Sequence, residues 1–326
     1  MKYLTEFSKD ELKNLMLSFN QPLYRADQLY DAIYKNYVNE IENITTFPKS
    51  LREVLKKDFR IFSMKILKIE KSKIDNVEKI LWGLSDGNKI ESVIIKGRRT
   101  TICVSTQVGC PIKCSFCASG KMEFKRNLTK GEIIEQILQL GNMKIDNIVF
   151  MGIGEPMLNL ENVISAVKML SIGARRVTIS TVGIPEKIKE FANLKTQIRL
   201  AVSLHSANEQ KRKLLVPHSP NLNAIFESLK YYQNLTNRLI TFEYVLIKDV
   251  NDSLKDAEEL VSKIKPFKCK VNLIIYNPNP FSPYEAPQFK NVKRFEEYIL
   301  NSKIKVTIRR RLGAEINSAC GQLAVM

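Results

Sequence analysis

The feature that most constrains the fold is a regular alternation of apolar and helical stretches that begins near residue 100. The apolar runs are rich in β-branched residues and span residues 101–106, 147–153, 176–181, 198–204, 239–247 and 269–276. Helical stretches lie near residues 130–141, 160–171, 185–194, 222–234, 253–264 and 290–300. This repeat predicts parallel β/α units in a sheet that is buried on both faces. The pattern leaves an open sheet and a complete or partial barrel as alternatives, and in either case functional residues should lie at the carboxyl ends of the strands.

The first 99 residues have a different pattern. Ser8 and Glu11 form a capping box ahead of an amphipathic stretch, and two further helical stretches follow before residue 60. The segment 78–95, with Asp86–Gly87 at its centre, predicts a β-hairpin. We therefore expect three parts, which are a helical accessory domain (1–62), a β-hairpin extension (63–99) and an α/β domain (100–326).

The charge of the chain favours a polyanionic partner. Lys and Arg number 51 against 34 Asp and Glu, a formal net charge of +17. Such an excess favours RNA or DNA, although a Lys-rich compositional habit would produce the same charge. No apolar run approaches the roughly 18 residues of a membrane helix, and the N-terminus lacks the apolar stretch of a signal peptide. We expect a cytoplasmic protein, in whose reducing surroundings structural disulfides are rare.

Three of the six cysteines are closely spaced. Cys110, Cys114 and Cys117 form a C-x3-C-x2-C motif just after the first apolar run. A zinc site usually has four ligands, and no fourth ligand with matching spacing is present, since His205 and His218 are distant in sequence. Three thiolates suit a four-iron cluster that keeps one iron open for a small molecule. A zinc site completed by a distant histidine, or three buried thiols, remain the alternatives.

The cysteine motif, placed after the first strand of a β/α series, resembles that of the radical S-adenosylmethionine (SAM) superfamily. Five further blocks follow in a fixed order, namely MGIGEPMLNL (151–160), RRVTISTVGIP (175–185), SLHSANEQKRKLLVP (203–217), YNPNPFSPYE (276–285) and ACGQL (319–323). Together they resemble the RNA adenine methyltransferases of the RlmN/Cfr family, and the resemblance covers nearly the whole chain. It implies a partial (β/α)6 barrel with a [4Fe–4S] cluster, held by Cys110, Cys114 and Cys117, whose open iron binds SAM.

The resemblance also implies a catalytic pair of cysteines. Adenine C2 is electron-poor, so it cannot attack the methyl group of SAM directly. In the family, a cysteine that matches Cys320 is methylated by one SAM, and a second SAM yields a 5′-deoxyadenosyl radical that takes a hydrogen from the S-methyl group. The methylene radical then adds to adenine. Cys103 matches the residue that resolves this crosslink by forming a disulfide with Cys320, and Glu91 matches the proton acceptor.

SAM contacts are carried over in the same way. By matching position, the residues implied to bind SAM are Gly154, Glu155, Ser180, Ser203, Leu204, His205 and Asn277. Without the family, Gly154 would indicate a simple turn and His205 a structural histidine. Their positions at the ends of predicted strands favour the SAM site. Cys269 and His218 receive no role.

The implied reaction is methylation of C2 of adenine 2503 in 23S rRNA and of adenine 37 in tRNAs, with two SAM used per methyl. Pro156 favours C2 over C8 methylation, the alternative within the family, because the C8 branch typically has Ala there. An alternative of another class is a non-catalytic, zinc-stabilised RNA-binding protein. The expected partners are 23S rRNA, tRNA and an electron donor such as flavodoxin, and the expected state is a monomer.

Overall fold

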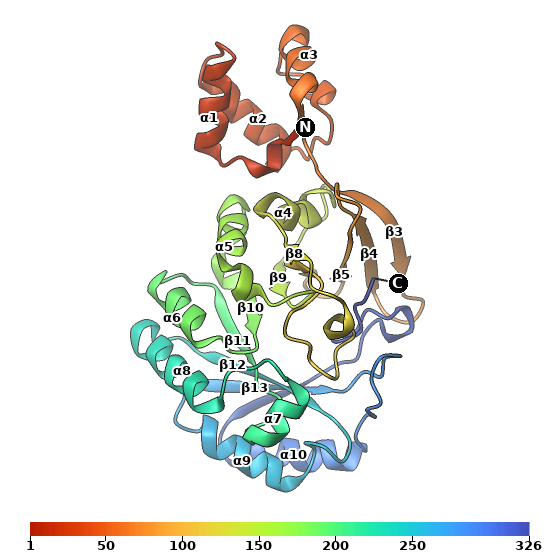
Figure 1. The fold of residues 1–326 in the computed structure, drawn as a ribbon, viewed down its shortest axis with the longest axis vertical. Helices are drawn as coiled ribbons and strands as arrows, with labels where there is room; N and C mark the ends of the chain where they lie inside the picture. Colours follow the sequence, from red (N-terminus) through yellow and green to blue (C-terminus); the bar gives the residue numbers. More distant parts are fainter. Residues whose placement is uncertain (326) are drawn as a thin grey trace.

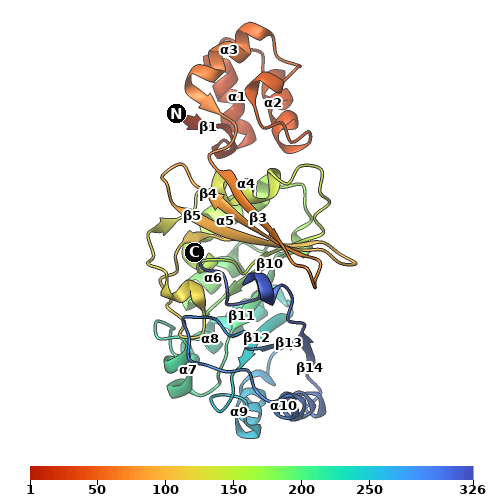
Figure 2. The ribbon, with the colours of Figure 1, turned by 90° about the vertical axis from the view of Figure 1, so that its right-hand side faces the viewer.

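A ten-stranded mixed sheet forms the centre of the computed structural model, which describes residues 1–325 (Figures 1 and 2). Seven of its strands are parallel and neighbour one another in chain order. These are β6 (Thr101–Cys103), β9 (Asn147–Phe150), β10 (Val177–Thr181), β11 (Arg199–Ser203), β12 (Ile240–Leu246), β13 (Cys269–Ile275) and β14 (Lys305–Arg309). The sheet ends at β14 without pairing back to β6, so the barrel is open on one side.

Helices connect these strands and cover the outer face of the sheet (Figure 1). They are α4 (Lys130–Leu138), α5 (Leu160–Met169), α6 (Pro185–Asn193), α7 (Glu209–Leu215), α8 (Leu222–Thr236), α9 (Leu254–Ile264) and α10 (Phe289–Asn301). The expected partial (β/α)6 barrel is confirmed. The strand β14 was not among the predicted runs, because polar residues alternate with Val306 and Ile308 at the sheet edge, so it lacks the continuous apolar run by which the inner strands were identified.

Three antiparallel strands extend the sheet beyond β6. These are β3 (Lys65–Lys71), β4 (Val77–Gly83) and β5 (Lys89–Ile95). The turn between β4 and β5 contains Asp86 and Gly87, whose φ is 82°, so the predicted hairpin is confirmed. The additional strand β3 was not predicted. It is exposed along most of its length, so it lacks the apolar alternation of a half-buried strand.

The N-terminal unit stands at one end of the molecule (Figure 2). It contains α1 (Lys9–Ser18), α2 (Tyr24–Tyr34) and α3 (Lys49–Asp58), and a short parallel pair of β1 (Lys2–Tyr3) and β2 (Phe59–Arg60). The capping box of Ser8 and Glu11 is present at the start of α1. Within residues 1–325, no helix is long and apolar enough to cross a lipid bilayer.

Shorter elements complete the fold. A two-stranded antiparallel pair, β7 (Gln107–Val108) with β8 (Arg126–Asn127), flanks the cysteine motif. The short 3-10 helices are η1 (Leu4–Glu6), η2 (Ile41–Asn43), η3 (Ala118–Lys121), η4 (Pro156–Asn159), η5 (Ala174–Arg176) and η6 (Ala314–Ile316).

Candidate active site

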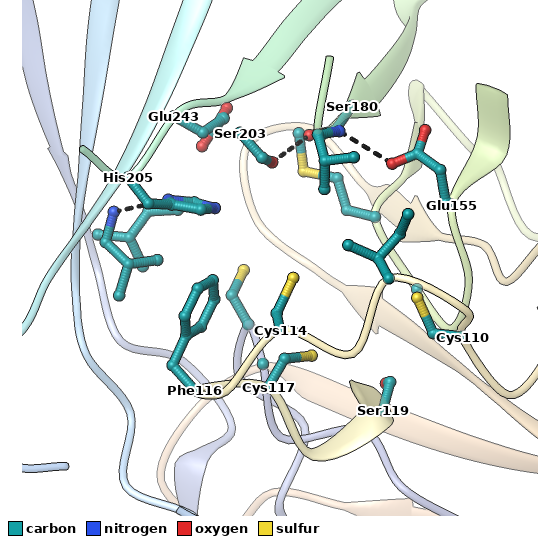
Figure 3. A pocket seen from close by; sticks show the side chains of 18 of the residues that line it. Cys110, Cys114, Phe116, Cys117, Ser119, Glu155, Ser180, Ser203, His205 and Glu243 are labelled. Carbon is teal, nitrogen blue, oxygen red and sulfur yellow. Dashed lines mark hydrogen bonds between the residues drawn. The ribbon is translucent and has the colours of Figure 1, made fainter. Parts of the chain in front are cut away.

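The three clustered cysteines lie on one loop between β7 and η3, at the carboxyl ends of the barrel strands (Figure 3). Ser115 N–H donates to the Leu215 carbonyl at 2.9 Å, and Ala118 N–H donates to the Gly321 carbonyl at 2.8 Å. These bonds fix the loop between helix α7 and the C-terminal segment. All three cysteines are half-buried, and their side chains line one cavity, which we call the cysteine cavity.

The surroundings of this loop disfavour free thiolates. Burial raises the pKa of Cys110 to about 12, and it also raises the pKa of Cys114 and Cys117, where neighbouring thiols add to the effect. Within residues 1–325, no three Cys, His, Asp or Glu side chains surround a single metal position. A [4Fe–4S] cluster binds each thiolate at a different iron, so it does not require such convergence and its irons stabilise the thiolates.

The cysteine cavity has a volume of about 910 Å³, including its open mouth. Its other side is formed by the carboxyl ends of β9 to β13 and the residues that follow them, and Figure 3 shows these side chains facing the cysteines. The implied SAM contacts that line it are Gly154, Glu155, Ser180, Ser203, His205 and Asn277. The hydroxyls of Ser180 and Ser203 lie 3.1 Å apart on neighbouring strands. Polar groups from separate strands therefore converge on one space.

Glu155 is a buried carboxylate at the wall of this cavity. Its Oε1 accepts from Met157 N–H at 3.0 Å, and its Oε2 accepts from Val182 N–H at 2.9 Å. Burial raises the pKa of Glu155 to about 7, although both backbone donors lower it. Gly154 has a φ of 106°, and a Cβ there would lie 2.6 Å from the Cβ of Gln107, so only glycine fits.

His205 and Leu204 are placed differently. The His205 Nδ1 accepts from Val245 N–H at 3.1 Å, and its ring packs edge-on against Phe116 with centroids 4.8 Å apart. Burial and the nearby Arg212 lower the pKa of His205 to about 3, so the imidazole is neutral. The Leu204 side chain is buried in the main core and does not line the cavity. Both backbone groups of Leu204 are also bonded within the protein, since its N–H donates to the Glu243 carbonyl at 3.0 Å and its carbonyl accepts from Ser206 N–H at 2.8 Å.

Sequence reasoning missed two charged residues of this site. Glu243 on β12 lines the cavity, and its Oε2 is buried without a hydrogen-bond partner, as is the Oδ1 of Asn277. The amino and hydroxyl donors of SAM would satisfy both atoms, so the cavity fits this cofactor. Arg212 is fully buried and donates to the carbonyls of Ser203, Leu204 and Val182. The sequence did contain a signal for Glu243, because a carboxylate within an otherwise apolar run indicates a buried functional residue.

A second cavity adjoins the first on the open side of the barrel, and we call it the lateral cavity. It contains Cys103 at the end of β6, Cys320, and the consecutive residues Arg309–Arg311. Burial and the neighbouring Cys320 raise the pKa of Cys103 to about 12. Cys320 is exposed and lines both cavities. The structure therefore brings together two cysteines that are more than 200 residues apart in the sequence.

The segment that carries Cys320 is held in place by hydrogen bonds. Asn277 Nδ2 donates to the Cys320 carbonyl at 3.1 Å, and Ser119 Oγ donates to the Leu323 carbonyl at 2.5 Å. Gln322 Nε2 donates to the Pro278 carbonyl at 2.8 Å. Cys320 is thus attached both to the loop of the cluster cysteines and to the end of β13.

Glu91 does not line either cavity. It lies on β5, is 3 % exposed, and its carboxylate is 3.3 Å from Lys79 Nζ. The backbone N–H of Ala324 faces this carboxylate, so the C-terminal segment covers it. Val93, two residues further along the same face of β5, lines the lateral cavity. Glu91 is therefore adjacent to the cavity but separated from it.

The fold and the site define a radical SAM enzyme. Residues 104–263 match the model of the radical SAM superfamily, whose members bind a [4Fe–4S] cluster and SAM. Residues 3–61 match the model described as the ribosomal RNA large subunit methyltransferase N-terminal domain. A radical SAM methyltransferase from Sphaerobacter thermophilus has the same structure, with a TM-score of 0.95 and 36% identity over 99% of both chains.

Full-length relatives show to which family within the radical SAM enzymes this chain belongs. The "Probable dual-specificity RNA methyltransferase RlmN" of Thermotoga neapolitana is 44% identical over 99% of this chain and 97% of the relative. The "Dual-specificity RNA methyltransferase RlmN" of Nitratiruptor sp. is 40% identical over 99% of this chain and 98% of the relative. The chain belongs to the RlmN family of SAM-dependent RNA methyltransferases. This membership excludes the alternative of a non-catalytic zinc protein.

Proposed function

We propose that the protein methylates C2 of adenine 2503 in 23S rRNA and of adenine 37 in tRNAs through an S-methylcysteine at Cys320. The observation that carries this proposal is the position of Cys320, which borders both the cysteine cavity and the lateral cavity. A residue at this boundary has access to SAM on one side and to an RNA base on the other. The full-length relatives named for dual specificity support the two RNA substrates.

Each side chain then has a distinct part. When bound, the cluster and SAM supply a methyl group and, from a second SAM, a 5′-deoxyadenosyl radical. Cys320 carries the methyl carbon to adenine C2. The C2 proton passes to Glu91. Cys103 then attacks the Cys320 sulfur, so that the sulfur–carbon bond breaks and a disulfide forms. The freed methylene carbon takes up a proton to complete the methyl group, the one electron that the cluster would supply is returned to it, and methylated RNA leaves. The shared cavity of Cys103 and Cys320 supports this pairing.

The choice of C2 over C8 rests on Pro156. This residue is buried at the start of η4, directly after the cavity residues Gly154 and Glu155. C8 methylation of the same rRNA adenine is the remaining alternative in the family. Because both reactions would use Cys320, the product and not the intermediate separates them.

Nucleoside analysis tests the regiochemistry. The anaerobically reconstituted protein would be incubated with SAM, a reductant and either a 23S rRNA fragment or a tRNA, and the digested nucleosides would be analysed by mass spectrometry. We expect 2-methyladenosine from both RNAs. Finding 8-methyladenosine would contradict the proposal, and product from only one RNA would contradict dual specificity.

The two cysteine roles are tested by substitution. Cys320→Ala should abolish product, whereas Cys103→Ala should trap a covalent protein–RNA adduct that appears as a band of higher mass under denaturing conditions. Cys269→Ala is the control, because this cysteine lies at the start of β13 away from both cavities. Normal turnover by Cys103→Ala would show that another group resolves the adduct.

We also propose the setting in which the enzyme works. An external one-electron donor of the flavodoxin type would reduce the cluster, and the enzyme would act as a monomer in the cytoplasm, where rRNA and tRNA are found. The formal charge of +17 supports an RNA partner. It also supports the monomeric state, because a net charge far from zero makes copies of a protein repel one another. Sedimentation of the reconstituted protein, free and with tRNA, would test the monomeric state.

A further inference from the structure

One face of the β3–β5 extension carries a row of charged side chains that leads to Glu91. Glu70 on β3 is paired in register with Lys79 on β4, and Glu91 on β5 is paired with Leu81, two residues along from Lys79. Lys79 Nζ lies 2.9 Å from Glu70 Oε2 and 3.3 Å from Glu91 Oε1. The lysine thus stands between two carboxylates on adjacent strands.

This row is buried at its inner end. Lys79 is only 9% exposed and Glu91 is 3% exposed, whereas Glu70 is partly accessible to solvent. The same face otherwise presents Val77 and Val93, which pack against Leu323 of the C-terminal segment. A lysine is rarely buried on such an apolar face unless its charge is paired. The placement of Lys79 therefore calls for an explanation, and its partner Glu91 offers one.

The two oxygens of Glu91 have different surroundings. Oε1 faces Lys79, while Oε2 is buried without a hydrogen-bond partner. The groups that face the carboxylate are Lys79, the more distant Glu70 and the backbone N–H of Ala324. One oxygen therefore lies next to the lysine, the other has no hydrogen-bond partner, and the carboxylate lies beside the segment that carries Cys320.

We propose that Lys79, itself held by Glu70, is the positioning residue that keeps Glu91 as a carboxylate beside the segment that carries Cys320. This inference rests on the proposed role of Glu91 as the base. Burial raises the pKa of Glu91, whereas Lys79 and the Ala324 N–H lower it, so without the lysine the carboxylate would be protonated more readily. A protonated Glu91 cannot accept the C2 proton of adenine, and the reaction would stop at the crosslinked adduct.

The test separates the two halves of the reaction. Methylation of Cys320 by SAM does not require a base at C2, whereas release of methylated RNA does. We expect Lys79→Met to methylate Cys320 as the wild type does, measured by intact-protein mass. Its release of 2-methyladenosine should fall roughly 100-fold, with the protein–RNA adduct accumulating, because a positioned base contributes that much or more. The rate of Lys79→Met should recover as the pH is raised, since the carboxyl then ionises without help.

Two further variants guard against a folding artefact. Lys79→Arg keeps a cation between the carboxylates and should restore most of the turnover. Lys89→Met removes an exposed lysine from the same strand as Glu91 and should behave as the wild type. Normal product release by Lys79→Met across the pH range would overturn the inference, as would a parallel loss of Cys320 methylation.

Glu91→Gln shows which proposal fails. If this variant accumulates the adduct and Lys79→Met does not, Glu91 is the base and the inference about Lys79 is wrong. If Glu91→Gln releases product at the wild-type rate, the assignment of Glu91 as the base is wrong, and the inference about Lys79 falls with it.

Discussion

Gly120, three residues after the last cysteine of the motif, is a position of the cluster loop that has no room for a Cβ atom. A Cβ at this position would lie 2.5 Å from the carbonyl oxygen of Cys114 and 2.9 Å from its backbone nitrogen. Both atoms belong to the backbone and cannot rotate away. The loop between Cys114 and Cys117 closes on itself at Gly120, so any larger residue must move the cysteines.

Gly120→Ala should therefore lower the amount of iron that the protein binds. We expect less than half of the wild-type iron and sulfide after anaerobic reconstitution, measured by colorimetric analysis and by the visible absorption of the cluster. Gly173→Ala is the matched control, because no atom lies within 4 Å of a Cβ there. Wild-type iron content in Gly120→Ala would show that the loop adapts.

Glu243 is the residue whose substitution best tests the SAM site. Its Oε1 accepts from Asn272 Nδ2 at 2.9 Å, and its Oε2 lies in the cavity 3.6 Å from the Arg309 guanidinium, without a hydrogen-bond partner. Glu243→Gln places an amide donor where SAM donors would bind, so we expect SAM affinity to fall about tenfold or more, measured by equilibrium dialysis on the reconstituted protein. Asn272→Ala, which leaves the carboxylate in place, should have a smaller effect. Equal affinities in Glu243→Gln and the wild type would place SAM away from Glu243.

What the sequence could predict at the residue scale depended on distance along the chain. The spacing of the three cysteines, and the positions of Ser203 and His205 at the end of a predicted strand, could be recognised from short stretches of the sequence. Leu204 lies between them, directly after β11, and its assignment to SAM binding came only from the resemblance, whereas its side chain lies in the core. The covering of Glu91 was not predictable, because it depends on a segment about 230 residues later that folds back on β5.

At the scale of elements, a single carboxylate joins three of them. Glu135 on α4 is fully buried and accepts from Thr5 Oγ1 at 2.6 Å, from Ser63 N–H at 2.9 Å and from Met64 N–H at 2.8 Å. These donors belong to η1 of the N-terminal unit and to the strand-free connection before β3. The unit is therefore fastened to the helix that follows the cluster loop.

This contact predicts a pH dependence of stability. Burial raises the pKa of Glu135 to about 7 from an ordinary 4.5, although its hydrogen-bond donors lower it. Between these values the folded protein binds the proton more tightly than the unfolded chain, so stability is greatest at low pH and is lost as the pH rises to about 7. The melting temperature of the wild-type protein should fall as the pH rises from about 5 to 7.5. The melting temperature of Glu135→Gln should fall less steeply over the same range. Glu155 has a similar pKa and contributes equally to the pH dependence of the wild type and of Glu135→Gln. Identical slopes of melting temperature against pH in the two proteins would therefore contradict this role for Glu135.

Elements were predictable where their pattern was strong. The six β/α repeats and the capping box of Ser8 were visible because local packing and capping determine them. The strands β3 and β14 lie at the two edges of the sheet, where one side has no neighbour. In β3 both apolar and charged residues are exposed, and in β14 polar residues alternate with Val306 and Ile308, so neither strand has the continuous apolar run by which the inner strands were identified.

For the whole molecule, the open side of the barrel decides where RNA can reach the cysteines. The lateral cavity lies between β6 and β14, and Cys103 and Cys320 border it. Arg310 and Arg311 stand at its rim, are exposed, and form no ion pair with any carboxylate of residues 1–325. Arg309 instead faces inward, 3.6 Å from Glu243. Two unpaired guanidinium groups thus remain at the entrance for phosphates beside the target base.

Reversing these two charges should weaken RNA binding more than the same change elsewhere. We expect Arg310→Glu/Arg311→Glu to lower the affinity for a 23S rRNA fragment roughly tenfold at moderate salt. The slope of log Kd against log salt should fall by about 1.4, since each contact to single-stranded RNA contributes about 0.7. Lys263→Glu/Lys265→Glu changes the net charge equally at the end of α9, on the outer side of the barrel, so it controls for the general field. An equal loss of RNA affinity in both double variants would mean that binding depends only on the total charge of the protein. A selective loss in the first would instead locate the phosphates of the target nucleotide at the mouth of the lateral cavity, within reach of Cys320.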